Sequence, residues 1–223
     1  PGRISSAINQ WNYLSKTRNL PFESYAGFIR SYPGFPKETT LRLRAEAALE
    51  NEFVSPERLL NYFDMAPPLT NIGRAQYALA LRGANRPEAA DMARQAWRGG
   101  EMSGPSSAYM EGLFGSQFTQ DDHDARMDAL LWQGEEEAAR RQIAKVSPGK
   151  QSLFMARMAY VRGQSPNNVG LPVPAEAQRD PGYQFNQTRY LRSTRQGSVA
   201  VNRLASRPAF DKTAFDAETF LTE

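Results

Sequence analysis

The sequence predicts an all-α protein, a right-handed superhelix (α-solenoid) of short antiparallel helix pairs with about ten to fourteen helices. Three observations lead to this fold class. Apolar and small residues recur at helical spacing along most of the chain. A helix that ends at glycine and is followed by an alanine-rich helix occurs three times. No convincing run of alternating β-branched residues is present, so we expect no sheet.

Each expected helix carries a stripe of small or apolar side chains on one face. The stripes are Leu41, Ala45, Ala48 and Leu49; Ala89, Ala90, Ala93, Ala96 and Trp97; Ala139, Ile143 and Val146; Phe154, Met158 and Val161; and Ala200, Leu204 and Ala205. These stripes predict that each helix buries one face on its neighbours.

Residues typical of helix starts and ends follow one another closely, so the sequence predicts short helices. Ser55-Pro56-Glu57 is typical of a helix start, with a capping serine, a proline at the first helical position and an acid at the positive helix end. Arg86-Pro87-Glu88 and Ser147-Pro148 are similar, and Thr119 with Asp122 resembles a capping box. The expected C-terminal caps are Gly83, Gly99, Gly134, Gly163 and Gly197.

The three repeats are ALALRGANRPEAADMARQAW, ALLWQGEEEAARRQIA and YLRSTRQGSVAVNRLA. Their spacing varies, so they predict a degenerate, TPR-like solenoid, with an irregular helical bundle as the alternative. Residues 163–181 are rich in proline and glycine, and we expect a loop or crossover there with at most one short helix. The helical pattern resumes at once, so we expect a single domain over residues 1–223.

Composition excludes several classes of function. The chain has no Cys, which excludes disulfides and thiol chemistry, and its single His makes a His-rich metal site or a Ser-His-Asp triad improbable. The formal charge of +3 comes from interleaved charges without a basic stripe, so we expect no nucleic-acid partner. No apolar run is long enough for a membrane span. The start, PGRISSAINQ, has no signal peptide and no initiator Met, as expected for a removed leader or an excised segment.

Motifs spread over most of the chain resemble the N-terminal superhelical region of the soluble lytic transglycosylases. The most specific lie between Asp122 and Trp132. The motifs are Tyr32-Pro33-Gly34, Leu41-Arg42 and Ala45-Glu46; Ala96-Trp97-Arg98; Phe118-Thr119, Asp122-His123, Arg126, Asp128 and Leu131-Trp132; Ala156-Arg157; and Asp180-Pro181-Gly182, Tyr190-Leu191-Arg192 and Arg207-Pro208.

The resemblance implies a periplasmic enzyme of a Gram-negative bacterium that cleaves peptidoglycan glycan strands. In that family a ring-like superhelix carries a separate, lysozyme-like catalytic domain with a Glu-Ser pair and a later Gly-Leu-Met-Gln segment. Here Glu23-Ser24 is the only Glu-Ser pair, it lies near the start, and no Gly-Leu-Met-Gln follows. We therefore expect the catalytic domain to be absent and the chain to be a fragment or a stand-alone relative.

Clustered carboxylates are the other candidates for chemistry. Asp121, Asp122, His123, Asp124 and Asp128 could ligate a metal only if they converged, but on a helix they fan out, so we expect capping and solvation instead. The carboxylates of Glu135, Glu136 and Glu137 belong to a solvated helix start, and those of Glu46 and Glu50 to an exposed i, i+4 pair.

Aromatic and basic side chains are the candidates for contact with a glycan. We expect Trp97 and Trp132 in the core and leave Trp11 open as a sugar-stacking residue. Six arginines could line a concave face, although pairing or solvation is the simpler interpretation. They are Arg126, Arg140, Arg141, Arg157, Arg189 and Arg192. The sequence assigns no catalytic, cofactor-binding or metal-binding residue and implies no cofactor.

The first hypothesis is a non-catalytic scaffold that organises the ring, guides glycan strands and positions its own C-terminal catalytic domain. In the parent enzyme, the resemblance implies a Glu beyond residue 223 as general acid and base, and a 1,6-anhydro product from the N-acetylmuramic acid to N-acetylglucosamine linkage. The alternative is a TPR-like protein–protein interaction module with no enzymatic role. A weaker third idea is a surface that docks other cell-wall proteins.

Overall fold

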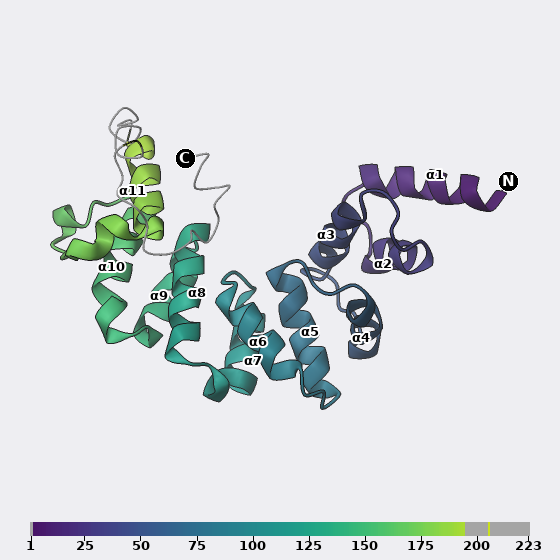
Figure 1. Cartoon of the computed structure of the whole chain (residues 1–223), viewed down its shortest axis with the longest axis horizontal. Coiled ribbons are helices and arrows are strands. Elements are labelled where there is room, and N and C mark those ends of the chain that lie inside the picture. The colour runs from purple at the N-terminus through teal and green to yellow at the C-terminus, as the bar shows by residue number, and fades with distance from the viewer. Residues whose placement is uncertain (1, 195–204, 206–223) are drawn as a thin grey trace. The chain divides into compact units, whose positions relative to one another are not determined.

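The computed structural model describes residues 2–194 and residue 205, and this part of the chain is all-helical, as the sequence predicted (Figure 1). The α-helices are α1 Gly2–Lys16, α2 Phe22–Ser31, α3 Glu38–Ala48, α4 Pro56–Met65, α5 Asn71–Gly83, α6 Ala89–Arg98, α7 Gly104–Phe114, α8 Gln120–Gln133, α9 Glu136–Gln142, α10 Gln151–Val161 and α11 Pro181–Ser193. Short 3-10 helices are η1 Gly115–Gln117, η2 Ile143–Lys145, η3 Pro148–Lys150, η4 Asn167–Val169 and η5 Ala175–Arg179. The described residues contain no strand.

Some expectations fall outside the described residues. They are the cap Gly197, the stripe residues Ala200 and Leu204, and the motif Arg207-Pro208.

Two helix starts confirm the capping signals in the sequence. Ser55 Oγ accepts a hydrogen bond from the Arg58 N–H, and Pro56 opens α4. At α8, Thr119 Oγ1 accepts from the Asp122 N–H at 3.1 Å, and the Asp122 carboxylate accepts from the Thr119 N–H at 2.9 Å. This complete capping box satisfies two helix-end donors reciprocally.

Two of the predicted glycine caps are confirmed. Gly134 and Gly163 have φ angles of 73° and 80°, in the left-handed region that favours glycine. The next residue after each glycine donates its N–H back to a carbonyl of the ending helix, from Glu135 to Leu130 and from Gln164 to Ala159, both at 2.9 Å. This 6→1 bond is typical of a Schellman motif.

The other two predicted caps within the described residues, Gly83 and Gly99, do not adopt the left-handed conformation. Gly83 is the last residue of α5, and the positive φ of 54° falls at Asn85. After α6 the positive φ of 86° belongs to Gly100 instead of Gly99. Each expectation was one or two residues from the observed turn.

The chain divides into two compact units, residues 1–97 with 102–117, and residues 98–101 with 118–223. No shift in composition marks this division, and a single domain over residues 1–223 stays a prediction. In the first unit, α2 packs on α3 and α4 packs on α5, so helices adjacent in sequence form pairs (Figure 1).

An aromatic cluster fills the core of the first unit. Phe22, Tyr25 and Phe28 of α2 and Tyr62 and Phe63 of α4 are all buried. The rings of Phe22 and Tyr62 meet edge to face with centroids 5.1 Å apart, a favoured aromatic geometry.

In the second unit, α8 packs on α9, α10 and α11, and α10 packs on α11 (Figure 1). Met127 and Leu130 of α8 meet Phe154 and Met158 of α10 in one apolar cluster. The Trp132 ring of α8 stacks on Phe185 of α11, with centroids 4.4 Å apart.

A buried arginine links three helices of this unit. Arg157 of α10 is fully buried and donates from Nη1 to Asp128 Oδ1 of α8 at 2.5 Å and from Nε to Asn186 Oδ1 of α11 at 2.8 Å. Asn186 in turn donates from Nδ2 to the Leu131 carbonyl at 2.9 Å. A charge buried this deeply is tolerated only when its donors are satisfied.

Residues 163–181 correct one expectation. Where at most one short helix was expected, two 3-10 helices form, η4 and η5. Prolines precede both of them, and 3-10 turns are short enough to fit between such residues. None of the described helices is both long and apolar enough to span a membrane.

We expect Gly182→Ala to destabilise the chain by about 2 kcal/mol, because a Cβ atom there would overlap the guanidinium of Arg157, which its hydrogen bonds hold in place. Gly112→Ala is the matched control, since Gly112 lies inside α7 with open space around it. It should stabilise by up to about 1 kcal/mol through helix propensity. Urea unfolding measures both, and equal stability of the two variants would refute the packing argument.

Candidate functional site

The structure corrects the expectation that Glu46 and Glu50 form an exposed pair. Glu50 is exposed, but Glu46 is fully buried. Glu46 Oε1 accepts from the Thr70 N–H at 2.8 Å and from Thr70 Oγ1 at 2.7 Å, and Oε2 accepts from the Leu69 N–H at 2.9 Å. These donors stand at the start of α5, where the helix dipole favours a negative charge. Glu46 therefore anchors α3 to the N-terminus of α5.

The acidic cluster around His123 does not converge. Asp122 is fully buried and completes the capping box, and its Oδ1 also accepts from Arg98 Nη1 at 2.9 Å. Asp121 stays exposed and pairs with the same Arg98 nitrogen at 2.8 Å. The hydrogen bonds that Arg98 donates to Asp121 and then to Asp122 raise the pKa of Arg98. Capping, as predicted, accounts for Asp122, although this residue is buried instead of solvated.

Asp124 and His123 form hydrogen bonds with residues outside the acidic cluster. Asp124 is buried and accepts from the Ser147 N–H at 2.7 Å and from Ser147 Oγ at 2.5 Å, so it fixes the residue that precedes η3. Gln142 Nε2 lies 3.2 Å from His123 Nδ1 and donates to the His123 carbonyl at 3.1 Å. Among the described residues, no group of three or more His, Cys, Asp or Glu side chains could hold a metal ion.

The run Glu135, Glu136 and Glu137 lies at the start of α9, as expected. Glu136 pairs with Arg162 Nε at 3.2 Å and Glu137 with Arg140 Nη1 at 3.5 Å, all with substantially exposed side chains. Ion pairs at such exposed positions contribute little to stability.

The tryptophans divide as the sequence predicted. Trp97 and Trp132 are buried core residues. Trp11 is half-buried: its Nε1 donates to the Pro36 carbonyl at 2.5 Å, and the Lys37 ammonium lies 5.8 Å from the centroid of its ring. That position makes Trp11 part of the contact between α1 and the loop before α3.

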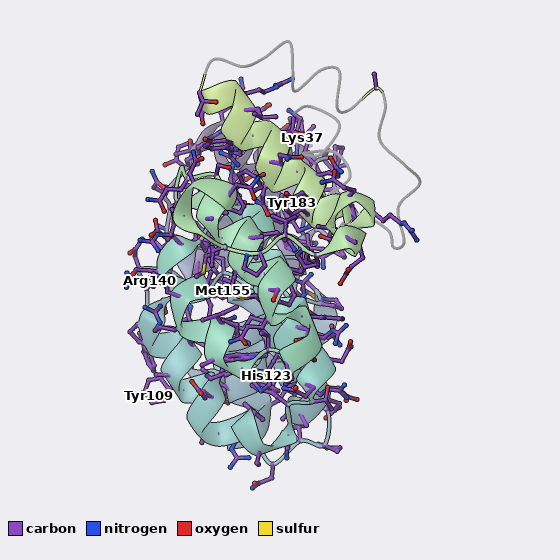
Figure 2. The ribbon with its side chains drawn as sticks, turned by 90° about the vertical axis from the view of Figure 1, so that its left-hand side faces the viewer. Lys37, Tyr109, His123, Arg140, Met155 and Tyr183 are labelled. Atoms are coloured by element: carbon purple, nitrogen blue, oxygen red, sulfur yellow. The ribbon has the colours of Figure 1, made fainter. Side chains whose placement is uncertain are left out.

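The candidate arginines fall into two groups. Arg126 and Arg157 are buried, and Arg126 donates to the Gly100 carbonyl at 2.5 Å, so neither lines an exposed face. The exposed group comprises Arg140, Arg141, Arg189 and Arg192. In the side view of Figure 2, Arg140 lies at the edge of the molecule.

The pKa values of Asp64 and Tyr77 are shifted within one ion-paired network. Hydrogen bonds from Arg86 and then Tyr77 hold the pKa of Asp64 below its usual range. Burial, followed by the hydrogen bond to Asp64, raises the pKa of Tyr77 to about 12. This network ties α4 to α5 and to the segment before α6, and it offers no group poised for proton transfer near neutral pH.

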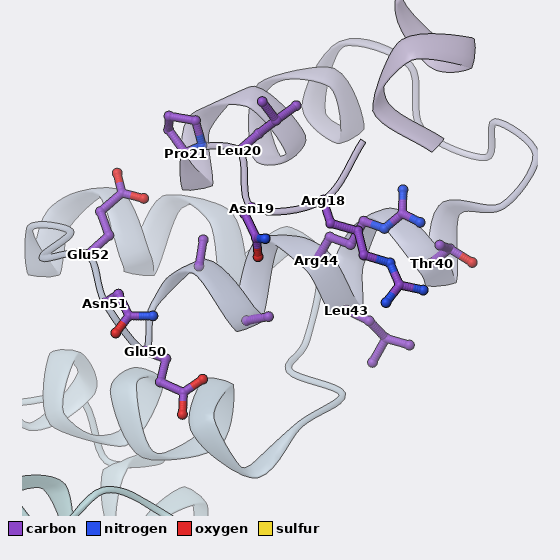
Figure 3. A pocket seen from close by; sticks show the side chains of 12 residues that line it. Arg18, Asn19, Leu20, Pro21, Thr40, Leu43, Arg44, Glu50, Asn51 and Glu52 are labelled. Carbon is purple, nitrogen blue, oxygen red and sulfur yellow. The ribbon is translucent and has the colours of Figure 1, made fainter. Parts of the chain in front are cut away.

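A pocket in the first unit is the best candidate site (Figure 3). It has a volume of about 700 Å³, within the range of small-ligand sites. Its walls are the segment between α1 and α2, one face of α3, and the segment between α3 and α4. The lining residues are Arg18, Asn19, Leu20, Pro21, Thr40, Leu43, Arg44, Ala47, Ala48, Glu50, Asn51 and Glu52.

Two charged side chains of the pocket are fixed by helix ends. Arg44 Nη1 donates to the Leu14 carbonyl at 2.6 Å, which holds the guanidinium against the C-terminus of α1. Glu52 Oε2 accepts from the Phe22 N–H at 2.7 Å, at the start of α2. Both contacts match the helix dipole, with a cation at a C-terminus and an anion at an N-terminus. The sequence predicted none of the residues in this pocket as a binding residue, and Glu50 was expected only as part of an exposed carboxylate pair.

In comparisons with protein-family models, with curated proteins and with solved structures, nothing matches the chain.

We expect Glu46→Gln to lower the free energy of unfolding by about 2 kcal/mol, because one accepting oxygen is replaced by an amide that cannot accept from the Leu69 and Thr70 donors. Glu50→Gln, at an exposed carboxylate in the turn after α3, should change it by less than about 0.5 kcal/mol. Chemical unfolding of both variants measures these changes. If Glu46→Gln lowers the free energy of unfolding as little as Glu50→Gln, the buried carboxylate is not needed for stability.

Proposed function

We propose that this chain is the non-catalytic superhelical region of a periplasmic soluble lytic transglycosylase from a Gram-negative bacterium. In this proposal its helix pairs stack into a right-handed, TPR-like superhelix. The superhelix shapes a ring, guides the glycan strands of peptidoglycan, and positions the catalytic domain of the same enzyme. Other cell-wall proteins are further candidate partners for its surface.

The observation that carries the proposal is the structural use of the most specific resembling segment, residues 122–132. Asp122 closes the capping box of α8, Arg126 binds the Gly100 carbonyl, and Trp132 stacks on Phe185. The residues that resemble the family's helical region therefore serve helix capping and packing. A scaffold requires this kind of use, and an active site does not.

Helix pairing gives a second line of support. Within the two units, α2 packs on α3, α4 on α5, α8 on α9, and α10 on α11. Pairs of sequential helices are the repeating element of an α-solenoid. The handedness and continuity of the superhelix belong to the proposal.

In the proposed enzyme, the chemistry belongs to a lysozyme-like domain beyond residue 223. There a Glu protonates the glycosidic oxygen between N-acetylmuramic acid and N-acetylglucosamine, then acts as base while a 1,6-anhydro end forms. The present chain contributes the platform on which that domain and the strand are held.

Sequencing the native coding region past the codon for Glu223 tests the link to the enzyme. We expect a further domain that contains a Glu-Ser pair followed by a Gly-Leu-Met-Gln segment. A stop codon directly after Glu223 would refute the enzyme proposal for this protein and favour a protein-binding module.

Purified chain should sediment with murein sacculi and should release no anhydro-muropeptides from them, because the catalytic Glu of the proposal lies outside it. The assay is co-sedimentation in moderate salt followed by chromatography of the soluble fraction, with cellulose as the control polymer. Equal retention on cellulose, or no retention on sacculi, would contradict strand guidance. Anhydro-muropeptides above a buffer control would place an active site within residues 1–223.

A further inference from the structure

The pocket of the first unit separates its charges. Arg18 and Arg44 extend toward the same end of it, whereas Glu50 and Glu52 lie on the opposite side (Figure 3). Within the described part of the chain, no ion pair involves any of these four side chains. Two guanidinium groups that share one end repel each other, so an anion bound there would lower their electrostatic energy. The carboxylates of Glu50 and Glu52 point away from each other, so the same argument favours a cation beside Glu50 alone (Figure 3).

Two of these groups have hydrogen-bonding capacity to spare. Arg18 and Glu50 are exposed and make no hydrogen bond or ion pair with any described residue. Arg44 uses Nη1 for the carbonyls of α1, and Glu52 uses Oε2 for the start of α2, which leaves Nη2 of Arg44 and Oε1 of Glu52 without a described partner. The helix-end contacts of Arg44 and Glu52 hold one cation and one anion in place before any ligand arrives. Such preorganisation reduces the entropy cost of binding.

The space between the charged ends is apolar and lined by small groups. Leu20, Pro21, Leu43, Ala47 and Ala48 supply the apolar surface. Asn19 and Asn51 are exposed and add amide groups that can bind a peptide backbone. Asn19 has a φ of 64°, a left-handed conformation that turns the chain between α1 and α2 along the rim of the pocket.

We propose that this pocket binds a short peptide with free termini, its carboxylate at Arg18 and Arg44 and its ammonium group at Glu50. Small side chains of the peptide lie on the apolar surface between them. A purely anionic ligand would leave Glu50 without a partner, and a purely apolar one would leave both Arg18 and Glu50 without partners. The proposal does not depend on the murein assignment, because a scaffold and a protein-binding module could both carry such a pocket.

Trialanine, N-acetyl-trialanine and trialanine amide are the probes, added at millimolar concentration to the full chain and followed by NMR of its backbone amides. We expect trialanine to perturb amides of residues that line the pocket. Loss of either terminal charge should weaken binding roughly threefold to tenfold, the cost of one partly exposed charged hydrogen bond.

Two variants test the two ends separately. Arg18→Ala and Glu50→Gln should each weaken trialanine binding roughly threefold to tenfold. Arg141→Ala and Glu176→Gln are the matched controls, because both residues are exposed, belong to the second unit and do not line the pocket. All four variants should keep the helical circular dichroism of the parent chain, since none of these side chains is buried.

Pairing variants with probes gives the sharpest result. Glu50→Gln should not weaken N-acetyl-trialanine further, because the ammonium group is already gone, and Arg18→Ala should not weaken trialanine amide further. The proposal is overturned if trialanine does not bind, if the blocked peptides bind as tightly, or if only the arginine end matters. The last result would indicate an anion site.

Discussion

Buried charged side chains that join one helix to another segment are the constraint on which the described fold depends. The helices are short, from 7 residues in α9 to 15 in α1, and helices of this length are marginal on their own. Glu46 ties α3 to the start of α5, Asp124 fixes the residue before η3, and Arg157 connects α8, α10 and α11. A buried charge is costly unless its partners are in place, so each of these contacts strongly favours one arrangement of the helices it joins.

This use of charge explains why clusters that look reactive in the sequence are structural. The carboxylates of Asp122 and Asp124 lie two residues apart, yet one caps its own helix and the other binds Ser147. Their oxygens point to different neighbours because successive residues of a helix diverge around its axis. The shifted pKa of Asp64 has a similar origin, in an ion pair that joins α4 to the segment before α6.

The pocket of the first unit differs in this respect. Its charges are separated by apolar surface, and Arg18 and Glu50 have no partner among the described residues. A scaffold role and a ligand pocket are compatible, because of the four charged groups in the pocket Arg44 and Glu52 hold helix ends while Arg18 and Glu50 do not. Those two residues link the shape of the pocket to the positions of α1 and α2.

The sequence by itself determined the helical class, the starts at Ser55 and Thr119, the ends at Gly134 and Gly163, and the core positions of the two tryptophans. These features depend on residues within one or two helical turns of each other, so they can be predicted from periodicity and capping residues. Only the tertiary structure decided that Glu46 is buried while Glu50 is exposed, and that residues 18–21 and 40–52 enclose a pocket. Burial of Glu46 depends on donors 23 and 24 residues away, and the pocket depends on two loops brought together by helix packing. Partners at such separations leave no local pattern, because the chain between them can take many paths before it folds.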